Sequence, residues 1–185
     1  MTSFRAALNR KKLLIYDGGF GTELFALGVD LPNTSLANEF HQDAVRRVTA
    51  SYIEAGSEVV QTNTFVASPL HLQMAGRNAE DTRSIVASGV RLAQDAIMAS
   101  GRMVYISGSM GPSPGAIETD AGDTSFGIPD VQVRDAHRLV AGTLAEGGVD
   151  LLCIETMFSA TEAAIAVDEA RAFNLPIAVN LTLKY

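Results

Sequence analysis

Asp17-Gly18-Gly19-Phe20-Gly21-Thr22 is the stretch that decides the fold of this chain. It follows the apolar run Leu13-Leu14-Ile15-Tyr16, which predicts a buried strand. Glycine lets the backbone turn sharply and approach a ligand, and two successive uncovered N–H groups bind a carboxylate or phosphate. The Asp17 carboxylate beside them can accept hydrogen bonds from an ammonium group. Together these groups fit an amino-acid zwitterion, although a tight strand-to-helix turn with a solvated aspartate explains the same residues.

Length and composition indicate a globular chain with one core. The chain has 185 residues, of which 47% are hydrophobic and 19% charged, so it has the material for one folded domain. Its net charge of -7 and its pI of about 4.9 argue against nucleic acid and anionic membranes as partners. No stretch of the sequence is long enough to span a bilayer.

The N-terminus and the cysteine count favour a cytoplasmic protein. The basic residues near the start are Arg5, Arg10, Lys11 and Lys12. The apolar run after them ends at Asp17 and is too short for a signal peptide, and a basic organelle-targeting segment is the weaker alternative. Cys153 is the single cysteine, which excludes an internal disulfide framework and fits a reducing cytosol.

Strand and helix patterns alternate along the whole chain. We expect strands at residues 13–17, 58–63, 103–107, 150–155 and 177–183. We expect helices at residues 23–27, 43–55, 81–100, 130–146 and 159–173. Connections are expected at residues 29–39 and 68–76, and a long functional loop at 113–129. This alternation predicts an α/β fold in which helices cover a parallel sheet.

Polar residues follow the predicted strands. The segment from Glu54 to Thr64 resembles the segment from Glu146 to Thr156, and in that register Asn63 matches Glu155. Asp17 and Ser109 occupy similar positions after their own strands. Polar groups gather at the carboxyl ends of the strands in a (β/α)8 barrel and in a doubly wound sheet. No G-x-G-x-x-G pattern follows a strand here, which argues against a dinucleotide site.

Four segments, in order and at sensible spacing, closely resemble the homocysteine S-methyltransferases, including the homocysteine-binding module of cobalamin-dependent methionine synthase. The resemblance covers the chain from Leu13 onward. The segments are Asp17-Gly18-Gly19-Phe20-Gly21-Thr22, Tyr52-Ile53-Glu54-Ala55-Gly56 with Thr62-Asn63-Thr64-Phe65, Gly108-Ser109-Met110-Gly111-Pro112, and Gly148-Val149-Asp150-Leu151-Leu152 with Glu155-Thr156.

The resemblance implies a fold and a reaction. Members of the family fold as a (β/α)8 barrel, also called a TIM barrel, and transfer a methyl group to the sulfur of homocysteine, giving methionine. Their methyl donors include methyl folates, used directly or through cobalamin, as well as betaine and S-methylmethionine. A zinc ion binds the homocysteine thiolate and lowers the pKa of the thiol, so the nucleophile exists at neutral pH. The expected partners are therefore homocysteine and a methyl donor.

The resemblance also assigns binding residues. Asp17, Gly18 and Gly19 correspond to the cradle for the amino-acid end of homocysteine. Glu155 corresponds to the acceptor for its ammonium group. Asn63 and Thr64 occupy positions that line the pocket floor in the family. Ser109 completes the expected set because it shares their strand-end position.

The zinc ligands of the family are missing from this sequence. Family members use three cysteines, one after an asparagine on a later strand and two in a Gly-Gly-Cys-Cys stretch. Residues 176–183 match the strand before that asparagine better and offer no thiol. Cys153 is expected to be a core residue one layer below Glu155, and one thiol cannot make a three-ligand site. We therefore expect no metal ligand and no catalytic residue in this segment, and an inactive chain on its own.

The expected organisation is an N-terminal extension at residues 1–12 and a barrel domain at residues 13–185. The latter holds about five β/α units and stops before the last strands, so residues 177–183 would form an unpaired apolar edge. Either the chain is part of a longer product with further domains, or it pairs with another chain, as in a homo-oligomer.

Two other functions remain open at the level of sequence. Asp17 and Glu155 are suitable as the acid–base pair of a lyase or hydrolase barrel. A relative that only binds a ligand or partner is the non-catalytic alternative. The histidines lack the spacing of metal ligands and are expected on the surface or in the core; they are His41, His71 and His137.

Overall fold

The computed structural model describes residues 3–10, 13–122 and 126–183, and its centre is a parallel sheet. The strands are β1 (Val59–Gln61), β2 (Tyr105–Met110), β3 (Leu151–Met157) and β4 (Ile177–Leu181). They are hydrogen-bonded in the order β1-β2-β3-β4, and each neighbouring pair is parallel. The predicted α/β class and the four strands after residue 57 are therefore confirmed.

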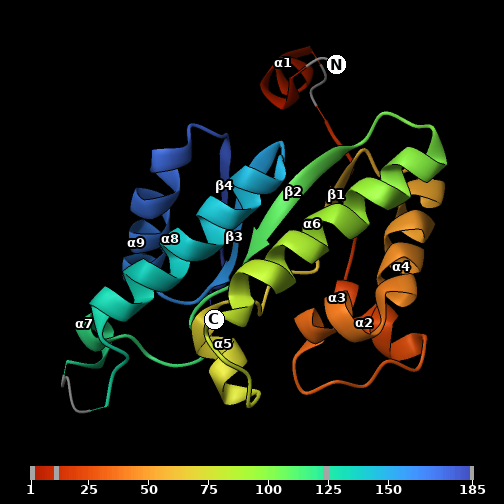
Figure 1. Ribbon diagram of the computed structural model, residues 1–185. Helices are drawn as coiled ribbons and strands as arrows, with labels where there is room; N and C mark the ends of the chain where they lie inside the picture. Colours follow the sequence, from red (N-terminus) through yellow and green to blue (C-terminus); the bar gives the residue numbers. More distant parts are fainter. Residues whose placement is uncertain (1–2, 11–12, 123–125, 184–185) are drawn as a thin grey trace.

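Four longer helices pack along the outer face of the sheet (Figure 1). They are α4 (Gln42–Ala55), α6 (Asp81–Ser100), α8 (Asp130–Gly147) and α9 (Ala160–Ala170). The first three end at glycines in the left-handed conformation, as expected for helices closed by Gly56, Gly101 and Gly148. Within the described residues, no helix combines the length and apolar character needed to cross a bilayer.

The helix expected after Asp43 begins slightly earlier. His41 precedes its first residue, so Asp43 lies inside the first turn and does not cap the helix. There the carboxylate of Asp43 pairs with the guanidinium of Arg46 at 2.9 Å, and it also suits the positive end of the helix.

Several short helices occupy segments that were expected to be connections. Residues 29–39 contain η1 (Thr34–Leu36) and the start of α3 (Ala37–Phe40), residues 68–76 contain α5 (Pro69–Met74), and residues 113–129 contain α7 (Glu118–Ala121). Their caps explain them: Asn33 accepts a hydrogen bond from the Ser35 N–H, and Ser68 accepts one from the His71 N–H. The other short helices are α1 (Phe4–Arg10), α2 (Phe20–Ala26) and η2 (Arg171–Phe173).

The expected first strand, at residues 13–17, is reduced to a single parallel bridge between Tyr16 and Val59. The Asp17 N–H donates to the Val59 carbonyl at 3.1 Å. Leu13 and Ile15 are 73% and 53% exposed, so the expectation of a buried strand is wrong. These side chains alternate with Leu14, which packs into the interior, and they lie at the open edge of the sheet.

Helix α1 closes the end of the sheet where the strands begin (Figure 1). Phe4 is buried against the first inward-facing residues of three strands, Val59, Tyr105 and Leu151. Its ring meets the Tyr105 ring edge-on, with centroids 5.5 Å apart and an interplanar angle of 80°. Part of the expected N-terminal extension therefore belongs to the core.

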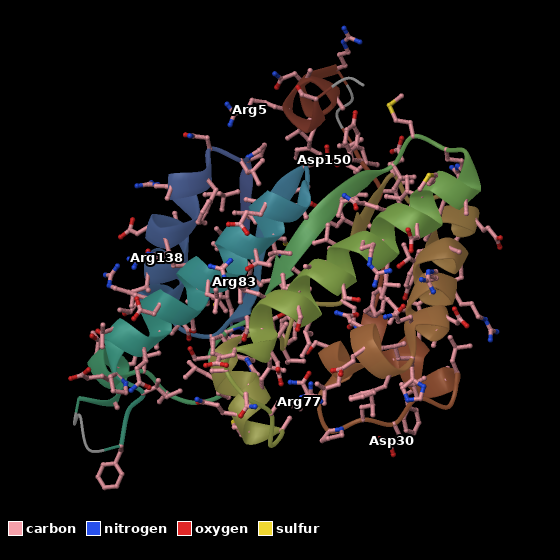
Figure 2. The ribbon with its side chains drawn as sticks, in the orientation of Figure 1. Arg5, Asp30, Arg77, Arg83, Arg138 and Asp150 are labelled. Carbon is pink, nitrogen blue, oxygen red and sulfur yellow. The ribbon has the colours of Figure 1, made fainter. Side chains whose placement is uncertain are left out.

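The outer helices are joined to one another by ion pairs. Arg83 on α6 reaches Glu146 on α8 at 3.4 Å, and Arg138 on α8 reaches Glu169 on α9 at 2.8 Å. Figure 2 shows both arginines on the outside of the helical layer. The polar groups that concern function lie instead at the opposite ends of the strands from α1.

Candidate substrate site

A pocket of about 380 Å³ lies where the strands end. It is formed by the edge segment (residues 13–17) and the turn after it, by Thr34 of η1, by the ends of β1, β2 and β3, and by three residues of the loop that follows β1. Its walls are Asp17, Gly18, Gly19, Phe20, Gly21, Thr34, Gln61, Thr62, Asn63, Phe65, Ser109 and Glu155. The structure thus brings six of the seven expected binding residues together, and their binding roles remain predictions.

Asp17 presents one carboxylate oxygen without a partner. Its Oδ2 accepts a hydrogen bond from the Gln61 N–H at 2.7 Å. Its Oδ1 is buried and accepts no hydrogen bond from the described residues. Burial raises the pKa of Asp17 to about 6, the nearby Glu155 charge adds to this rise, and the Gln61 N–H opposes it. A cation placed at Oδ1 would satisfy both the orphaned acceptor and the charge.

Glu155, near the end of β3, is held by residues of β1 and β2. Its Oε1 accepts a hydrogen bond from the Gln61 side-chain Nε2 at 2.7 Å and a short one from the Ser109 hydroxyl. The strand pairing shifts between Ile154 and Met157, and Thr156 has a φ of 60°, which is rare for a β-branched residue. Such a bulge re-aims the side chains of a strand, here beside a pocket.

A close contact with a side chain of α4 favours glycine at position 18. A Cβ atom there would lie 2.9 Å from the Tyr52 hydroxyl, which donates to the Gly19 carbonyl at 3.2 Å. The backbone of the Gly18–Gly19 turn therefore lies against α4 and is fixed by Tyr52. This contact gives a structural reason for the first glycine of the Asp-Gly-Gly pattern, and the turn lies beside the Asp17 carboxylate on the pocket wall.

Asn63 and Thr64 have different environments. The Asn63 side-chain amide donates to the Thr34 carbonyl at 2.8 Å and to Asn38 Oδ1 at 3.0 Å, so it fixes the loop that forms one wall. Thr64 is buried behind the pocket and is not among its lining residues. Its hydroxyl donates to the Ser109 carbonyl at 2.7 Å and thereby connects the ends of β1 and β2.

Gln61 is the main residue that sequence reasoning missed. It is the last residue of β1 and contacts both carboxylates of the pocket. A signal was present, because successive side chains of a strand alternate and Gln61 shares the inward face with Val59. Thr34 was missed for another reason: it belongs to a segment expected to be an irregular loop.

The residues described do not fit the zinc ion that the family resemblance implies. Cys153 is 2% exposed, and burial, with a contribution from the Glu155 charge, raises the pKa of its thiol to about 12. The thiol lies one layer below Glu155, as expected, and accepts a hydrogen bond from Asn180 Nδ2 at 3.9 Å. No group of three metal-binding side chains forms among the described residues. A buried thiol of raised pKa is a poor zinc ligand.

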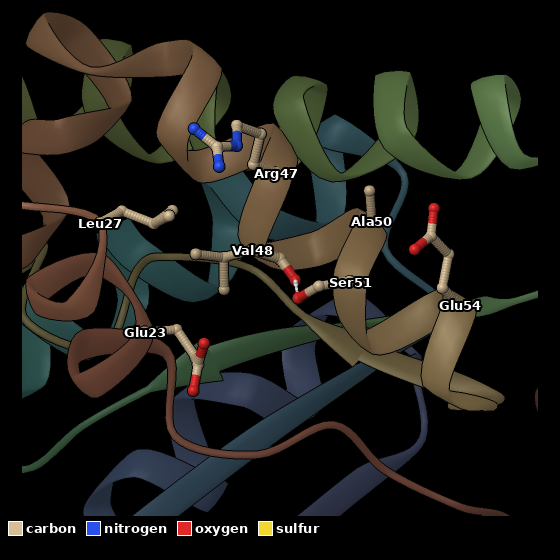
Figure 3. Close-up of a pocket in the computed structure, with 7 residues that line it drawn as sticks. All are labelled: Glu23, Leu27, Arg47, Val48, Ala50, Ser51 and Glu54. Atoms are coloured by element: carbon tan, nitrogen blue, oxygen red, sulfur yellow. Dashed lines mark hydrogen bonds between the residues drawn. The ribbon is translucent and has the colours of Figure 1, made fainter.

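A second hollow lies on the outside of the molecule (Figure 3). It is formed between α2 and α4 and lined by Glu23, Leu27, Arg47, Val48, Ala50, Ser51 and Glu54. It shares no residue with the pocket at the strand ends. The two carboxylates that suit an ammonium ligand, Asp17 and Glu155, line the strand-end pocket and not this hollow.

Comparison with solved structures supports the barrel-like fold. The structure of the homocysteine methyltransferase MmuM from Escherichia coli, in its metallated form, superposes with a TM-score of 0.77 at 23% sequence identity. The match covers 94% of this chain and 64% of that chain. The parallel sheet and its outer helices therefore correspond to part of a TIM barrel.

Sequence comparison finds relatives of two kinds. Methionine synthase from Mycobacterium tuberculosis is 29% identical over 156 residues, which cover 79% of this chain and 12% of that protein. Homocysteine S-methyltransferase from Escherichia coli is 28% identical over 174 residues, covering 86% of this chain and 55% of the relative. Homocysteine S-methyltransferase 4 from Zea mays is 27% identical over 191 residues, which cover 92% of this chain and 55% of that protein. The chain thus spans about half the length of these shorter relatives.

The family model described as homocysteine S-methyltransferase matches residues 14–185, nearly the whole chain. This match does not favour a lyase or hydrolase barrel built on Asp17 and Glu155. It agrees with the segments from which the resemblance was first inferred. The chain belongs to the homocysteine S-methyltransferase family.

Proposed function

We propose that this chain supplies the amino-acid-binding half of a homocysteine S-methyltransferase. The observation that carries the proposal is the pair of carboxylates, Asp17 and Glu155, in one pocket with a buried Asp17 oxygen that has no described partner. Two carboxylates with an unused acceptor suit the ammonium group of an amino acid. Family membership supports homocysteine as that amino acid.

The proposed complex places each end of homocysteine by its charge. The ammonium group lies between Asp17 Oδ1 and the Glu155 carboxylate. The carboxylate of homocysteine lies against the Gly18–Gly19 turn, where the backbone has no side chain to keep a ligand away. The sulfur end points out of the pocket toward the reacting methyl group, which is bound elsewhere.

We assign thiol activation and donor binding to parts of the protein other than these residues. In the complete enzyme, zinc would stabilise the deprotonated form of the homocysteine thiol, and the side chains described here do not fit the ion. The methyl donor, for example a methyl folate or a cobalamin-bound methyl group, would be carried by further segments, further domains or another chain. The small share of methionine synthase that the chain covers supports further domains. We place the complete protein in the cytoplasm.

Calorimetry with homocysteine tests the proposal. We expect Glu155→Gln to weaken binding by about 1–3 kcal/mol, because a charge-assisted hydrogen bond is lost. Glu146→Gln is the matched control, since the Glu146 side chain is 69% exposed on α8, outside the pocket. Unchanged affinity in Glu155→Gln, or no binding to the unmodified chain, would contradict the proposed function.

A further inference from the structure

Asp17 and Glu155 are held in one pocket by a third residue. The Gln61 backbone N–H donates to Asp17 Oδ2 at 2.7 Å, and the Gln61 side-chain amide donates to Glu155 Oε1 at 2.7 Å. Two carboxylates that face one pocket repel each other, and each is better solvated outside it. Donors on both of them oppose that repulsion, and here one residue provides a donor to each.

The backbone of Gln61 departs from the strand pairing to do this. Between the edge segment and β1, the Val59 N–H donates to the Ile15 carbonyl and the Asp17 N–H donates to the Val59 carbonyl. In a regular parallel ladder the next donor, the Gln61 N–H, would meet the Asp17 carbonyl. It meets the Asp17 side chain instead. The pairing therefore ends where the carboxylate is held.

The chemistry of an amide suits this position. A lysine or arginine at residue 61 would place its own cation between the carboxylates, and a glutamate would add a third negative charge. A glutamine donates a hydrogen bond and remains neutral. The subsite thus keeps two carboxylates and room for one cation from the ligand. The Ser109 hydroxyl, the other donor to Glu155, is neutral as well.

We propose that Gln61 is the positioning residue of the ammonium subsite and that it makes the pocket selective for ligands that carry an amino group. This inference rests on the proposed function, because the ligand is homocysteine. Gln61 acts through Asp17 and Glu155. It is expected to affect only the part of the affinity that depends on the ligand's ammonium group.

Two ligands and two matched variants test the selectivity. The ligands are homocysteine and the analogue of homocysteine that lacks the amino group, and nuclear magnetic resonance titration of the chain measures both affinities. Gln61→Met keeps the size of the side chain and the backbone donor to Asp17, and it removes the side-chain donor to Glu155. Gln94→Met is the control, because the Gln94 amide likewise donates one hydrogen bond, to the Gly147 carbonyl at 2.9 Å, but lies on the outer helices away from the pocket. We expect Gln61→Met to lose about tenfold in homocysteine affinity and nothing for the analogue, and Gln94→Met to change neither.

A measurement without ligand separates this inference from the proposed function. The carboxyl carbon of Asp17 reports its titration, which is expected near pH 6 in the unmodified chain. Gln61→Met keeps the backbone N–H that donates to Asp17 and removes only the side-chain amide, whose dipole offsets the Glu155 charge. The nearby Glu155 charge raises the pKa of Asp17, so the midpoint of Asp17 should move upward in this variant. Equal losses for both ligands, or an unchanged midpoint, would overturn the positioning role. If the unmodified chain binds neither ligand, the proposed function fails and the Asp17 midpoint alone decides the role of Gln61.

Discussion

His137 Nε2 lies 3.0 Å from Glu162 Oε1, and both side chains are almost fully buried. The same Glu162 oxygen accepts a hydrogen bond from the Ser113 N–H at 2.6 Å. These contacts join α8, α9 and the start of the loop that follows β2. The hydrogen bonds from His137 and Ser113 lower the pKa of Glu162 against the opposing effect of burial. The buried Glu162 carboxylate therefore anchors the start of the long loop between β2 and α8.

Glu162→Gln is expected to destabilise the chain by about 2–4 kcal/mol at neutral pH, because it removes the charged acceptor of two buried hydrogen bonds. Glu146→Gln makes the same change in the exposed pair with Arg83 and should cost less than about 1 kcal/mol. Because the folded-state pKa of Glu162 is depressed, its contribution is present above the unfolded pKa and is lost as the pH falls through the folded pKa. Urea unfolding of both variants checks this, and equal costs would refute the anchoring role.

Phe4→Ala is expected to destabilise the chain by about 3 kcal/mol, because a buried ring that contacts Tyr105 is removed from the base of the sheet. Leu8→Ala, on the same helix but at a side chain that is 50% exposed, should cost less than about 1 kcal/mol. Chemical denaturation measures both. A cost below about 1 kcal/mol for Phe4→Ala would mean that α1 is not part of the cooperative core.

The four paired strands could be predicted because each is an apolar run followed by a polar residue at a strand end. The exposure of residues 13–17 could not be predicted. The apolar pattern of Leu13 and Ile15 is the same whether or not a neighbouring segment covers their side chains. The short helix α5 depends on one cap, Ser68, and one proline, Pro69, and is too brief to show a helical period.

The residues of the candidate site could likewise be predicted only in part. Asp17 and Glu155 were predictable because acidic residues just after apolar runs stand out in the sequence. Gln61 carried only one weak signal, its place on the inward face of its strand, because its importance depends on two contacts made across segments that are distant in sequence. Thr64 stands in the same motif as Asn63, yet the alternation of the chain turns it behind the pocket wall.

Asp17→Asn is expected to stabilise the chain above pH 6 by about 1–3 kcal/mol while abolishing homocysteine binding. The pKa of Asp17 is raised to about 6, so the folded state holds a proton that the unfolded state has lost, and stability falls as the pH rises from the unfolded value of 3.8 to about 6. Thermal unfolding across this pH window tests the effect. The variant should show a smaller fall than the unmodified chain, and identical pH profiles would contradict the assignment.

The short chain lacks the thiolates that zinc binding needs. The single thiol, Cys153, is buried and protonated at neutral pH because its pKa is raised to about 12. Carboxylates and water would hold zinc only weakly, since zinc prefers nitrogen and sulfur ligands. We therefore expect the 185-residue chain to bind no stoichiometric zinc and to form no methionine from homocysteine.

Lengthening the protein to include the cysteine-bearing strands of the family should restore zinc binding and methyl transfer together, because the metal site and the closed barrel depend on the same segments. Metal analysis and a methionine-formation assay, run on the short and the lengthened protein side by side, provide the test. Cys153→Ser in the lengthened protein is the control and should leave the zinc content unchanged, because that thiol lies below the pocket. Tight zinc binding by the short chain would instead require ligands shared between two chains, and its zinc content would then depend on protein concentration.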